Sequence, residues 1–321
     1  MADFNRAKEV LTLNFPERVD SSILDQLAQE TAEIYHTDRS LLDNVLLDLK
    51  SVEYIDPEGA LSIICFCAAL RKKNSNISFE VLYPSGKVVD YLAWIGFFGQ
   101  LNNKVGLPKR QDLVHLENTM RIERSSRIKE RKLSAIPTAI LLPLESIPAA
   151  GTLTTANAYE EKCRHFVNHM SDTLGELFSS AHYNFSGWDE HDFLLSNSEL
   201  FKNTFQHSNS WGLGMVHARP DFGTTVCFYD IGVGFRGSVG KDDARKSIEW
   251  AMVDGNSSKG GEDNDGHGLT IVQNFVRRRN GTIKIRSGDC LIEISRDKQI
   301  PSLVKRFPGV QISYFIPVQP K

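Results

Sequence analysis

Three polar residues at intervals of four are the feature of this sequence best suited to chemistry. Glu199, Asn203 and His207 lie in the segment ELFKNTFQH, and a helix of about 3.6 residues per turn would place them on one face. Leu200 and Phe205 would then point toward a core. A carboxylate and a carboxamide one turn apart suit a hard cation such as Mg²⁺ and can orient a nucleophile. Because a solvated helix face is the competing interpretation, the motifs that follow in the chain decide between the two.

An aspartate and two glycines come directly after an apolar strand pattern further along the chain. They are Asp230, Gly232 and Gly234 in the run DIGVG. A carboxylate at a strand end can accept a hydrogen bond from an exocyclic amine, which would select adenine. Glycines allow positive φ and let the backbone lie close to a flat base or a ribose. On its own, such a run is typical of a simple turn.

A second glycine motif, Gly266-His267-Gly268-Leu269, opens an amphipathic helix pattern. Its glycines would expose backbone N–H groups at the helix N-terminus, which suits a phosphate group. Asn203, with Glu199 beside it, could then hold Mg²⁺ against the phosphate oxygens. Each motif alone also occurs in ordinary turns and helix starts, but the three in this order predict a site for a purine nucleotide. His207 lies one turn beyond the pair, and we interpret it as structural.

The composition is that of a globular protein with room for two domains. The chain has 321 residues, 41% hydrophobic and 24% charged, and its formal net charge of −3 gives no electrostatic reason to bind nucleic acid or an anionic membrane. The first residues lack the apolar core of a signal peptide, and the most apolar run, 60–70, is too short to span a bilayer. We therefore expect a cytoplasmic protein. Its five cysteines are odd in number and lack metal-ligand spacing, which predicts buried, reduced thiols.

Strand and helix patterns alternate in the first half of the chain. Strands are predicted at 10–15, 44–49 and 77–82, and helices at 21–36, 59–73 and 86–96. This order indicates an α/β domain with helices packed on a sheet. Between 117 and 134, six basic residues are interleaved with acidic ones, so we interpret 119–137 as a linker. The predicted domains are 1–118 and 138–321.

The second half begins mainly with helices and ends mainly with strands. A strand at 139–144 and a long helix at 156–179 precede the helix that carries Glu199. Later strands are predicted at 224–229, 282–286, 291–295 and 310–318, with a helix at 268–279. Ser287-Gly288-Asp289 predicts a hairpin turn between 282–286 and 291–295. The pattern predicts an α+β two-layer sandwich with helices on one face of the sheet.

The motifs of the second half resemble those of the GHKL family of ATP-binding domains, which includes gyrase, Hsp90, histidine kinases, MutL and the anti-sigma-factor serine kinases. Over about 139–318, Glu199 and Asn203 match the N box, Asp230-x-Gly232-x-Gly234 the G1 box, and Gly266-x-Gly268 the G2 box. The resemblance implies a Bergerat-type fold, an adenine contact at Asp230, Mg²⁺ at Asn203 and Glu199, and a general-base or water-positioning role for Glu199. The residues that it implies for binding ATP and Mg²⁺ are Asn203, Asp230, Gly232, Gly234, Lys259, Gly266, His267, Gly268 and Leu269.

The segment 235–265 would be the ATP lid of such a domain. It is rich in Gly, Ser, Asp and Lys, which suits a mobile cover. Its run Asn256-Ser257-Ser258-Lys259 is most similar to the anti-sigma-factor kinases, which implies that Lys259 approaches the γ-phosphate; a solvated lysine is the alternative. The Gly-Thr that usually precedes the family's last strand is here Gly309-Val310, so this corner of the site lacks one hydroxyl group.

The first half resembles a STAS domain, the fold of anti-anti-sigma factors, over about 10–101. The run VLLDLKSVEYIDPEGA at 45–60 carries the resemblance. Regulatory members have a phosphorylatable serine just before the glycine, where this chain has Glu58, a fixed charge that phosphorylation cannot switch. The alternative explanation of Asp56-Pro57-Glu58 is structural, namely a helix N-cap followed by an acidic first turn.

Three functions are compatible with the sequence. The first is a regulatory protein that binds ATP and Mg²⁺, a serine/threonine-kinase-like or partner-switching factor acting on another protein such as a STAS or sigma-type regulator. The second is a GHKL ATPase that hydrolyses ATP and rearranges its domains or a homodimer. The third is an ATP-sensing interaction module without turnover. A histidine kinase fits least, because nothing before the Glu199 helix resembles a phosphoacceptor box.

Overall fold

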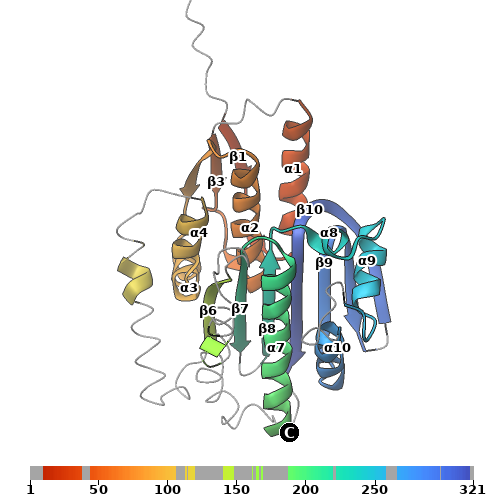
Figure 1. Cartoon of the computed structure of the whole chain (residues 1–321). Coiled ribbons are helices and arrows are strands. Elements are labelled where there is room, and N and C mark those ends of the chain that lie inside the picture. The colour runs from red at the N-terminus through yellow and green to blue at the C-terminus, as the bar shows by residue number, and fades with distance from the viewer. Residues whose placement is uncertain are drawn as a thin grey trace, which may run out of the picture. The chain divides into compact units, whose positions relative to one another are not determined.

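The computed structural model divides into two compact units, Met1–Met120 and Arg121–Lys321 (Figure 1). It describes residues 10–37, 44–105, 113, 115–119, 140–147, 161, 164, 165, 168, 187–219, 222–257, 266–296 and 298–318. The boundary between the units falls within the predicted linker. Most of that linker, and most of the predicted helix at 156–179, lie outside the described residues.

The first unit contains a parallel sheet with the strand order β1-β3-β5. Its strands are β1 (Val10–Asn14), β3 (Asn44–Asp48) and β5 (Ser78–Leu82). The described helices are α1 (Ile23–Thr37), α2 (Pro57–Lys73), α3 (Lys87–Ile95) and α4 (Phe97–Val105), and a short strand β2 (Arg18–Val19) pairs with β4 (Tyr54–Ile55). The predicted alternation of strand and helix is confirmed, and it is the arrangement that parallel pairing requires because each crossover spans the sheet.

Helix α2 begins at a complete N-terminal cap. The Asp56 side chain accepts a hydrogen bond from the backbone N–H of Gly59 at 2.7 Å, and Pro57 and Glu58 occupy the first turn. The basic residues 71–73 form the last turn, where the helix dipole favours positive charge. Every residue from Pro57 to Leu70 is buried. The structural explanation of Asp56-Pro57-Glu58 is therefore sufficient for the fold, and α2 is the central helix of this unit.

The second unit is built on an antiparallel sheet with the strand order β6-β7-β8-β10-β9. Its strands are β6 (Ile140–Ile147), β7 (Gly212–Arg219), β8 (Gly223–Asp230), β9 (Thr282–Ser295) and β10 (Lys298–Pro317). Its described helices include α7 (Gly187–His207), α8 (Gly234–Val239), α9 (Ala244–Ala251) and α10 (Gly268–Arg278). The whole chain is thus a mixed α and β protein with parallel and antiparallel sheets. Sequence patterns did not predict β7, α8 or α9.

The predicted hairpin turn at Ser287-Gly288-Asp289 is wrong. These residues lie inside the continuous strand β9, and the described part of the turn between β9 and β10 is Arg296, which has a φ of 46°. Ser287 pairs with Val310 and Gly288 with Phe307, and the register shifts on both sides of Phe307. Gly288 has a φ of 61°. A turn-like triplet therefore marks an irregularity of two long paired strands, because extra residues in β10 are absorbed as bulges.

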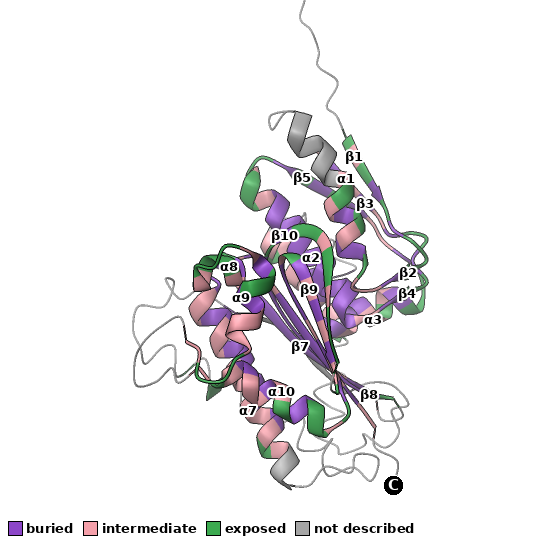
Figure 2. Cartoon of the chain, turned by 90° about the vertical axis from the view of Figure 1, so that its right-hand side faces the viewer, coloured by how far each residue is buried: buried purple, intermediate pink, exposed green. Residues whose placement is uncertain are grey.

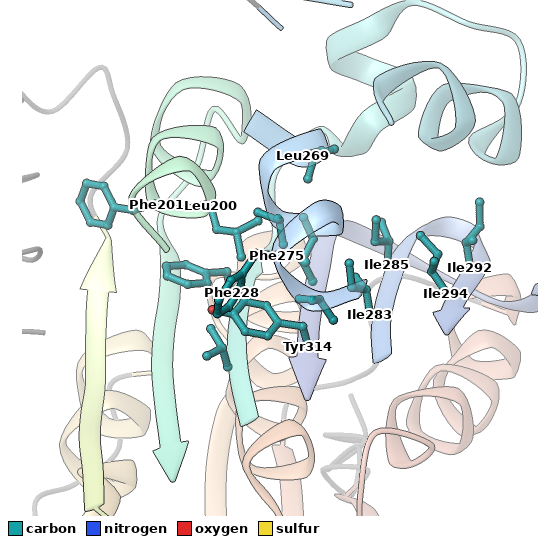
Figure 3. Close-up of a cluster of buried hydrophobic side chains, with 14 of the residues drawn as sticks. Leu200, Phe201, Phe228, Leu269, Phe275, Ile283, Ile285, Ile292, Ile294 and Tyr314 are labelled. Carbon is teal, nitrogen blue, oxygen red and sulfur yellow. The ribbon is translucent and has the colours of Figure 1, made fainter. Parts of the chain in front are cut away.

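Helices α7 and α10 pack on one face of this sheet, and their contact surface is the core of the second unit (Figures 2 and 3). As the sequence predicted, Leu200 and Phe205 of α7 are buried. Phe193 of α7, Phe275 of α10 and Tyr314 of β10 form an aromatic group with edge-to-face contacts, with ring centroids 6.0–6.4 Å apart. This group joins the two helices to the sheet and so fixes where their ends lie.

The described cysteines lie in the protein interior. Cys65, Cys67, Cys227 and Cys290 are buried and outside any disulfide, as predicted, and Cys163 lies outside the described residues. Burial raises the pKa of the Cys67 thiol far above its usual value, which keeps it protonated and unreactive. In the described part of the chain no helix is long and apolar enough to cross a membrane.

The buried hydroxyl of Tyr314 provides a test of the core. It donates to Oδ1 of Asn197 at 3.1 Å, while the Asn197 amide group donates to the carbonyl oxygen of Phe193 at 2.7 Å. Tyr314→Phe should lower the free energy of unfolding by about 1–2 kcal/mol, because a buried amide oxygen loses its donor. Urea unfolding measures this change. Tyr54→Phe, at an exposed ring, is the matched control, and equal effects of the two variants would contradict the assignment.

Partly buried His217 on β7 should make the stability of this unit depend on pH. Burial, and then the charge of Arg219, lower the pKa of His217 to about 3. An unfolded histidine titrates near pH 6.5, so between about pH 6.5 and 3 only the unfolded chain takes up the proton, and stability is lost as the pH falls. The His217→Gln variant should not show this loss. The free energy of unfolding of the variant minus that of wild type should therefore rise by about 2 kcal/mol between pH 7 and pH 5. Urea unfolding at both pH values measures this gain, and a constant difference would contradict the prediction.

Candidate functional site

The polar stripe of α7 forms one wall of a pocket. Glu199, Asn203 and His207 all line it, and each is partly buried. One oxygen of Glu199, Oε1, forms an ion pair with Nζ of Lys202 at 2.8 Å. The side chains of Glu199 and Lys202 are 19% and 41% exposed, respectively. The pair therefore lies on the rim of the pocket, where it is open to a ligand but shielded from bulk water on one side.

The second motif brings α10 against this wall. A side chain at Gly268 would place its Cβ 2.9 Å from Oε2 of Glu199 and 3.4 Å from Nδ2 of Asn203. Glycine thus allows the first turn of α10 to lie directly beside the carboxylate and the carboxamide. Gly266, His267 and Leu269 also line the pocket, and Leu269 is at the same time a member of the hydrophobic core. The N-terminal end of α10 therefore faces the Glu199–Asn203 pair.

Asp230 ends β8 at the inner side of the pocket and is only 3% exposed. Its Oδ1 accepts hydrogen bonds from the backbone N–H groups of Gly232 at 2.7 Å and of Val310 at 3.3 Å. Gly309, with a φ of 82°, lies so close to the Asp230 carbonyl group that no side chain would fit. At this corner, where the resembled family has a threonine hydroxyl, a backbone N–H of β10 contacts the aspartate. A buried carboxylate is thus held in a fixed orientation by two separate segments.

The glycines of the first motif are required by contacts within the protein. A Cβ at Gly232 would overlap the carbonyl oxygen of Ser208, directly after α7, and the neighbouring Val233 N–H donates to that same oxygen at 3.0 Å. Gly234 has a φ of 70°, and a Cβ there would lie 2.7 Å from Oγ of Ser287. That hydroxyl group also accepts from the Phe235 N–H at 3.0 Å. The close approaches that the structure shows for these two glycines are to Ser208 and to Ser287 of β9.

The pocket has a volume of about 360 Å³, within the usual range of small-molecule sites. Polar groups from α7, α10 and Asp230 meet an apolar surface from β8 and β10. Its lining consists of Glu199, Lys202, Asn203, Thr204, Gln206, His207, Ser208, Phe228, Asp230, Gly234, Phe235, Ser238, Val239, Trp250, Ala251, Asn256, Ser257, Gly266, His267, Gly268, Leu269, Ile271, Val310 and Ile312. A flat apolar group and an anionic group could therefore bind together.

Two helices, α8 and α9, form the first part of the predicted lid (Figure 1). The Asp243 side chain caps α9 by accepting from the Lys246 N–H at 2.7 Å, and this bond is the main reason why the pKa of Asp243 is lowered. Arg245 and Glu249 form an exposed ion pair at 2.8 Å on the same helix. The lid is thus partly a capped helix that carries Trp250 to the pocket wall. The structure does not describe residues 258–265, which include Lys259.

The segment after α9 is joined to the N-terminus of α10. Nδ1 of His267 lies 2.6 Å from Oδ1 of Asp254, and hydrogen bonding to His267 is the largest cause that lowers the pKa of Asp254. Gly266, with a φ of 72°, packs against the backbone of 255–256; a Cβ there would lie 2.6 Å from the Asn256 carbonyl carbon. Asn256 in turn donates to the Trp250 carbonyl oxygen at 2.8 Å. His267 therefore has a structural partner beside the pocket.

The donor set suits a magnesium ion bound together with a ligand. Among the described residues there is no group of three or more His, Cys, Asp or Glu side chains that could hold a metal ion alone. Mg²⁺ usually takes one or two protein oxygens and completes its shell with water and phosphate oxygens. Asn203 and Glu199 offer that number on one pocket wall. No protein-family model matches this chain, and neither does any curated protein.

The pocket contains residues that the sequence motifs did not identify. Lys202, Gln206 and Ser208 come from α7 or the residue after it, and Trp250 and Ser257 from the lid segment. The α7 residues were recognisable in principle, since positions 199, 202, 203, 206 and 207 follow the i, i+3, i+4, i+7 pattern of one helix face. Trp250 was not recognisable, because its place depends on how α9 packs.

Gly232 provides a steric test of the loop that orients Asp230. Gly232→Ala should lower the free energy of unfolding by about 2–3 kcal/mol, because its methyl group would overlap the backbone of Ser208. Gly240→Ala is the control: its φ is 72° but nothing lies within 4 Å, so only the cost of about 1 kcal/mol for a left-handed residue is expected. Urea unfolding measures both, and a Gly232→Ala effect no larger than the control would contradict the contact.

Proposed function

We propose that this chain binds ATP with Mg²⁺ in the pocket of its second unit and acts as a regulatory protein on a protein partner. The observation that carries the proposal is the convergence of three separate sequence motifs on one pocket. Glu199 and Asn203, Asp230, and Gly266–Leu269 are distant in sequence, yet all line it. Chance motifs have no reason to meet in space, which is why their meeting supports a common ligand.

Each part of the proposed site has a distinct role. The buried Asp230 would accept a hydrogen bond from the adenine amino group, against the apolar surface of Phe228 and Ile312. The N-terminal turn of α10 would face the phosphates. Asn203 and Glu199 would hold Mg²⁺, which supplies charge neutralisation of the phosphate chain when bound. Glu199 would also orient or deprotonate an attacking hydroxyl group or water.

The proposed folds are a STAS-like first unit and a Bergerat-type second unit. A parallel sheet β1-β3-β5 with a capped, central α2 supports the first proposal. An antiparallel sheet with α7 and α10 on one face supports the second. Glu58 in the first turn of α2 is only 8% exposed and carries no hydroxyl group, so a phosphoryl acceptor would have to lie on another protein. We propose a cytoplasmic regulator, whose partner is a STAS or sigma-type protein or a second copy of this chain.

Nucleotide binding tests this proposal directly. Isothermal titration calorimetry of the full chain should give binding of ATP and ADP that is strengthened by Mg²⁺. GTP should bind at least about tenfold more weakly, because guanine carries a carbonyl oxygen at C6, where adenine has the amino group that would donate to Asp230. Asp230→Asn should weaken ATP binding by about 10- to 100-fold, since an amide presents a donor beside the two backbone N–H groups. Wild-type protein that binds neither ATP nor ADP would refute the proposal.

Product analysis with [γ-³²P]ATP separates the regulatory kinase from its alternatives. Transfer of label to a protein substrate supports the kinase, whereas release of free phosphate supports an ATPase switch. Binding without either product, with Glu199→Ala retaining biological activity while Asp230→Asn loses it, supports an ATP-sensing module. In the first two cases Glu199→Ala should reduce turnover strongly, because Glu199 acts on the attacking group. It should also reduce the strengthening of ATP binding by Mg²⁺, because Glu199 would hold the ion as well.

A further inference from the structure

The described lining of the pocket carries more negative than positive charge, which is unfavourable for an anionic ligand. Two carboxylates, Glu199 and Asp230, line it. Among the lining residues that the structure describes, Lys202 is the only lysine or arginine. A nucleotide triphosphate carries several negative charges, and two carboxylates in a partly closed site repel it. The ligand therefore needs a cation from the protein in addition to any metal ion.

Lys202 is placed to supply that charge. It precedes Asn203 directly and lies one turn after Glu199, whose Oε1 is 2.8 Å from its ammonium nitrogen. The other Glu199 oxygen lies beside Gly268 at the start of α10. An ammonium group has three donors, and the bond to Glu199 uses one of them. Lys202 can therefore keep Glu199 in place and donate to a ligand oxygen at the same time.

We propose that Lys202 contacts the phosphate chain of a bound nucleotide while its bond to Glu199 fixes that carboxylate beside the phosphates. The inference rests on the proposed nucleotide function and adds to it the ligand class, a nucleoside di- or triphosphate in preference to the nucleoside. Gln206, one turn further along α7, also lines the pocket but carries no charge. Lys202 is thus a ligand-binding residue and a positioning residue for Glu199.

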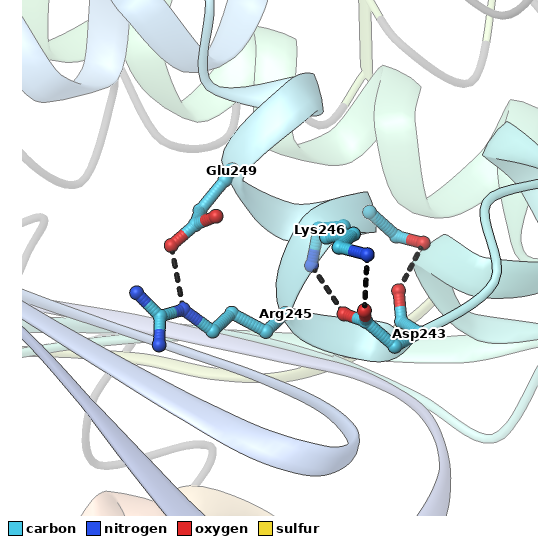
Figure 4. A network of polar contacts seen from close by, with 5 residues as sticks. Asp243, Arg245, Lys246 and Glu249 are labelled. Atoms are coloured by element: carbon cyan, nitrogen blue, oxygen red, sulfur yellow. Dashed lines mark hydrogen bonds and ion pairs between the residues drawn. The ribbon is translucent and has the colours of Figure 1, made fainter.

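The test compares the affinities of ATP, ADP and adenosine for the full chain by calorimetry in EDTA, which removes any effect through Mg²⁺. Lys202→Met should weaken ATP and ADP about tenfold and leave adenosine within about twofold. Lys202→Arg should retain most of the ATP affinity. Lys246→Met is the matched control, because Lys246 forms a similar i,i+3 pair with Asp243 at 3.5 Å but does not line the pocket (Figure 4); it should change none of the three affinities.

A double variant separates a direct contact from simple neutralisation of Glu199. Glu199→Gln combined with Lys202→Met leaves the net charge of the pair unchanged. If Lys202 contacts phosphate, the double variant stays about tenfold weaker for ATP than wild type. Recovery of wild-type ATP affinity in the double variant would overturn the inference, as would an equal loss of adenosine and ATP affinity in Lys202→Met. If wild-type protein binds ATP but Lys202→Met binds it equally well, the inference alone fails; if wild-type protein binds no nucleotide, the proposed function fails with it.

Discussion

The packing of α7 against α10 determines the geometry of the polar wall of the pocket, and Gly268 lies at the contact between the two helices. The aromatic group of Phe193, Phe275 and Tyr314 holds both helices on the sheet. With the helices held in this way, Gly268 lets the first turn of α10 lie beside Glu199 and Asn203 without displacing their side chains. Close-packed interiors transmit such constraints over several residues, because side chains have no free volume into which to relax. The hydrophobic core is therefore what positions the polar pair.

A second constraint acts at the opposite side of the pocket, where a carboxylate is buried. Burying Asp230 is unfavourable unless its charge is compensated by hydrogen bonds. Two backbone N–H groups, from Gly232 and Val310, provide that compensation and come from segments far apart in sequence. The loop after β8 and the bulged part of β10 are thus tied to one side chain. Val310, directly after Gly309, supplies one of these donors through its backbone.

Local sequence patterns predicted most helices and strands, but less of how they pair and pack. The alternation of the first unit, the buried side of α7 and the cap of α2 follow from periodicity and from residues such as Asp56, and these could be read directly. Strand β7 could not, because its residues are buried at nearly every position and so do not alternate. The turn-like Ser287-Gly288-Asp289 was misleading, because a bulge and a hairpin use the same residue types and only the partner strand distinguishes them. Lys202 lies on the same helix face as Glu199 and could have been recognised from its spacing. Trp250 enters the pocket through the packing of α9, which no local pattern contains.

The two kinds of residue in the motifs carry different information. Gly232, Gly234, Gly266 and Gly309 are all required by contacts inside the protein or by positive φ, so the fold would need them even with an empty pocket. Glu199, Asn203 and Lys202 are different, because nothing in the packing of α7 demands a carboxylate, a carboxamide and an ammonium group at a partly buried rim. Keeping charged groups there costs desolvation that apolar residues would avoid. The glycines thus identify the scaffold, and the polar residues of α7 are the part of the motif that points to a ligand.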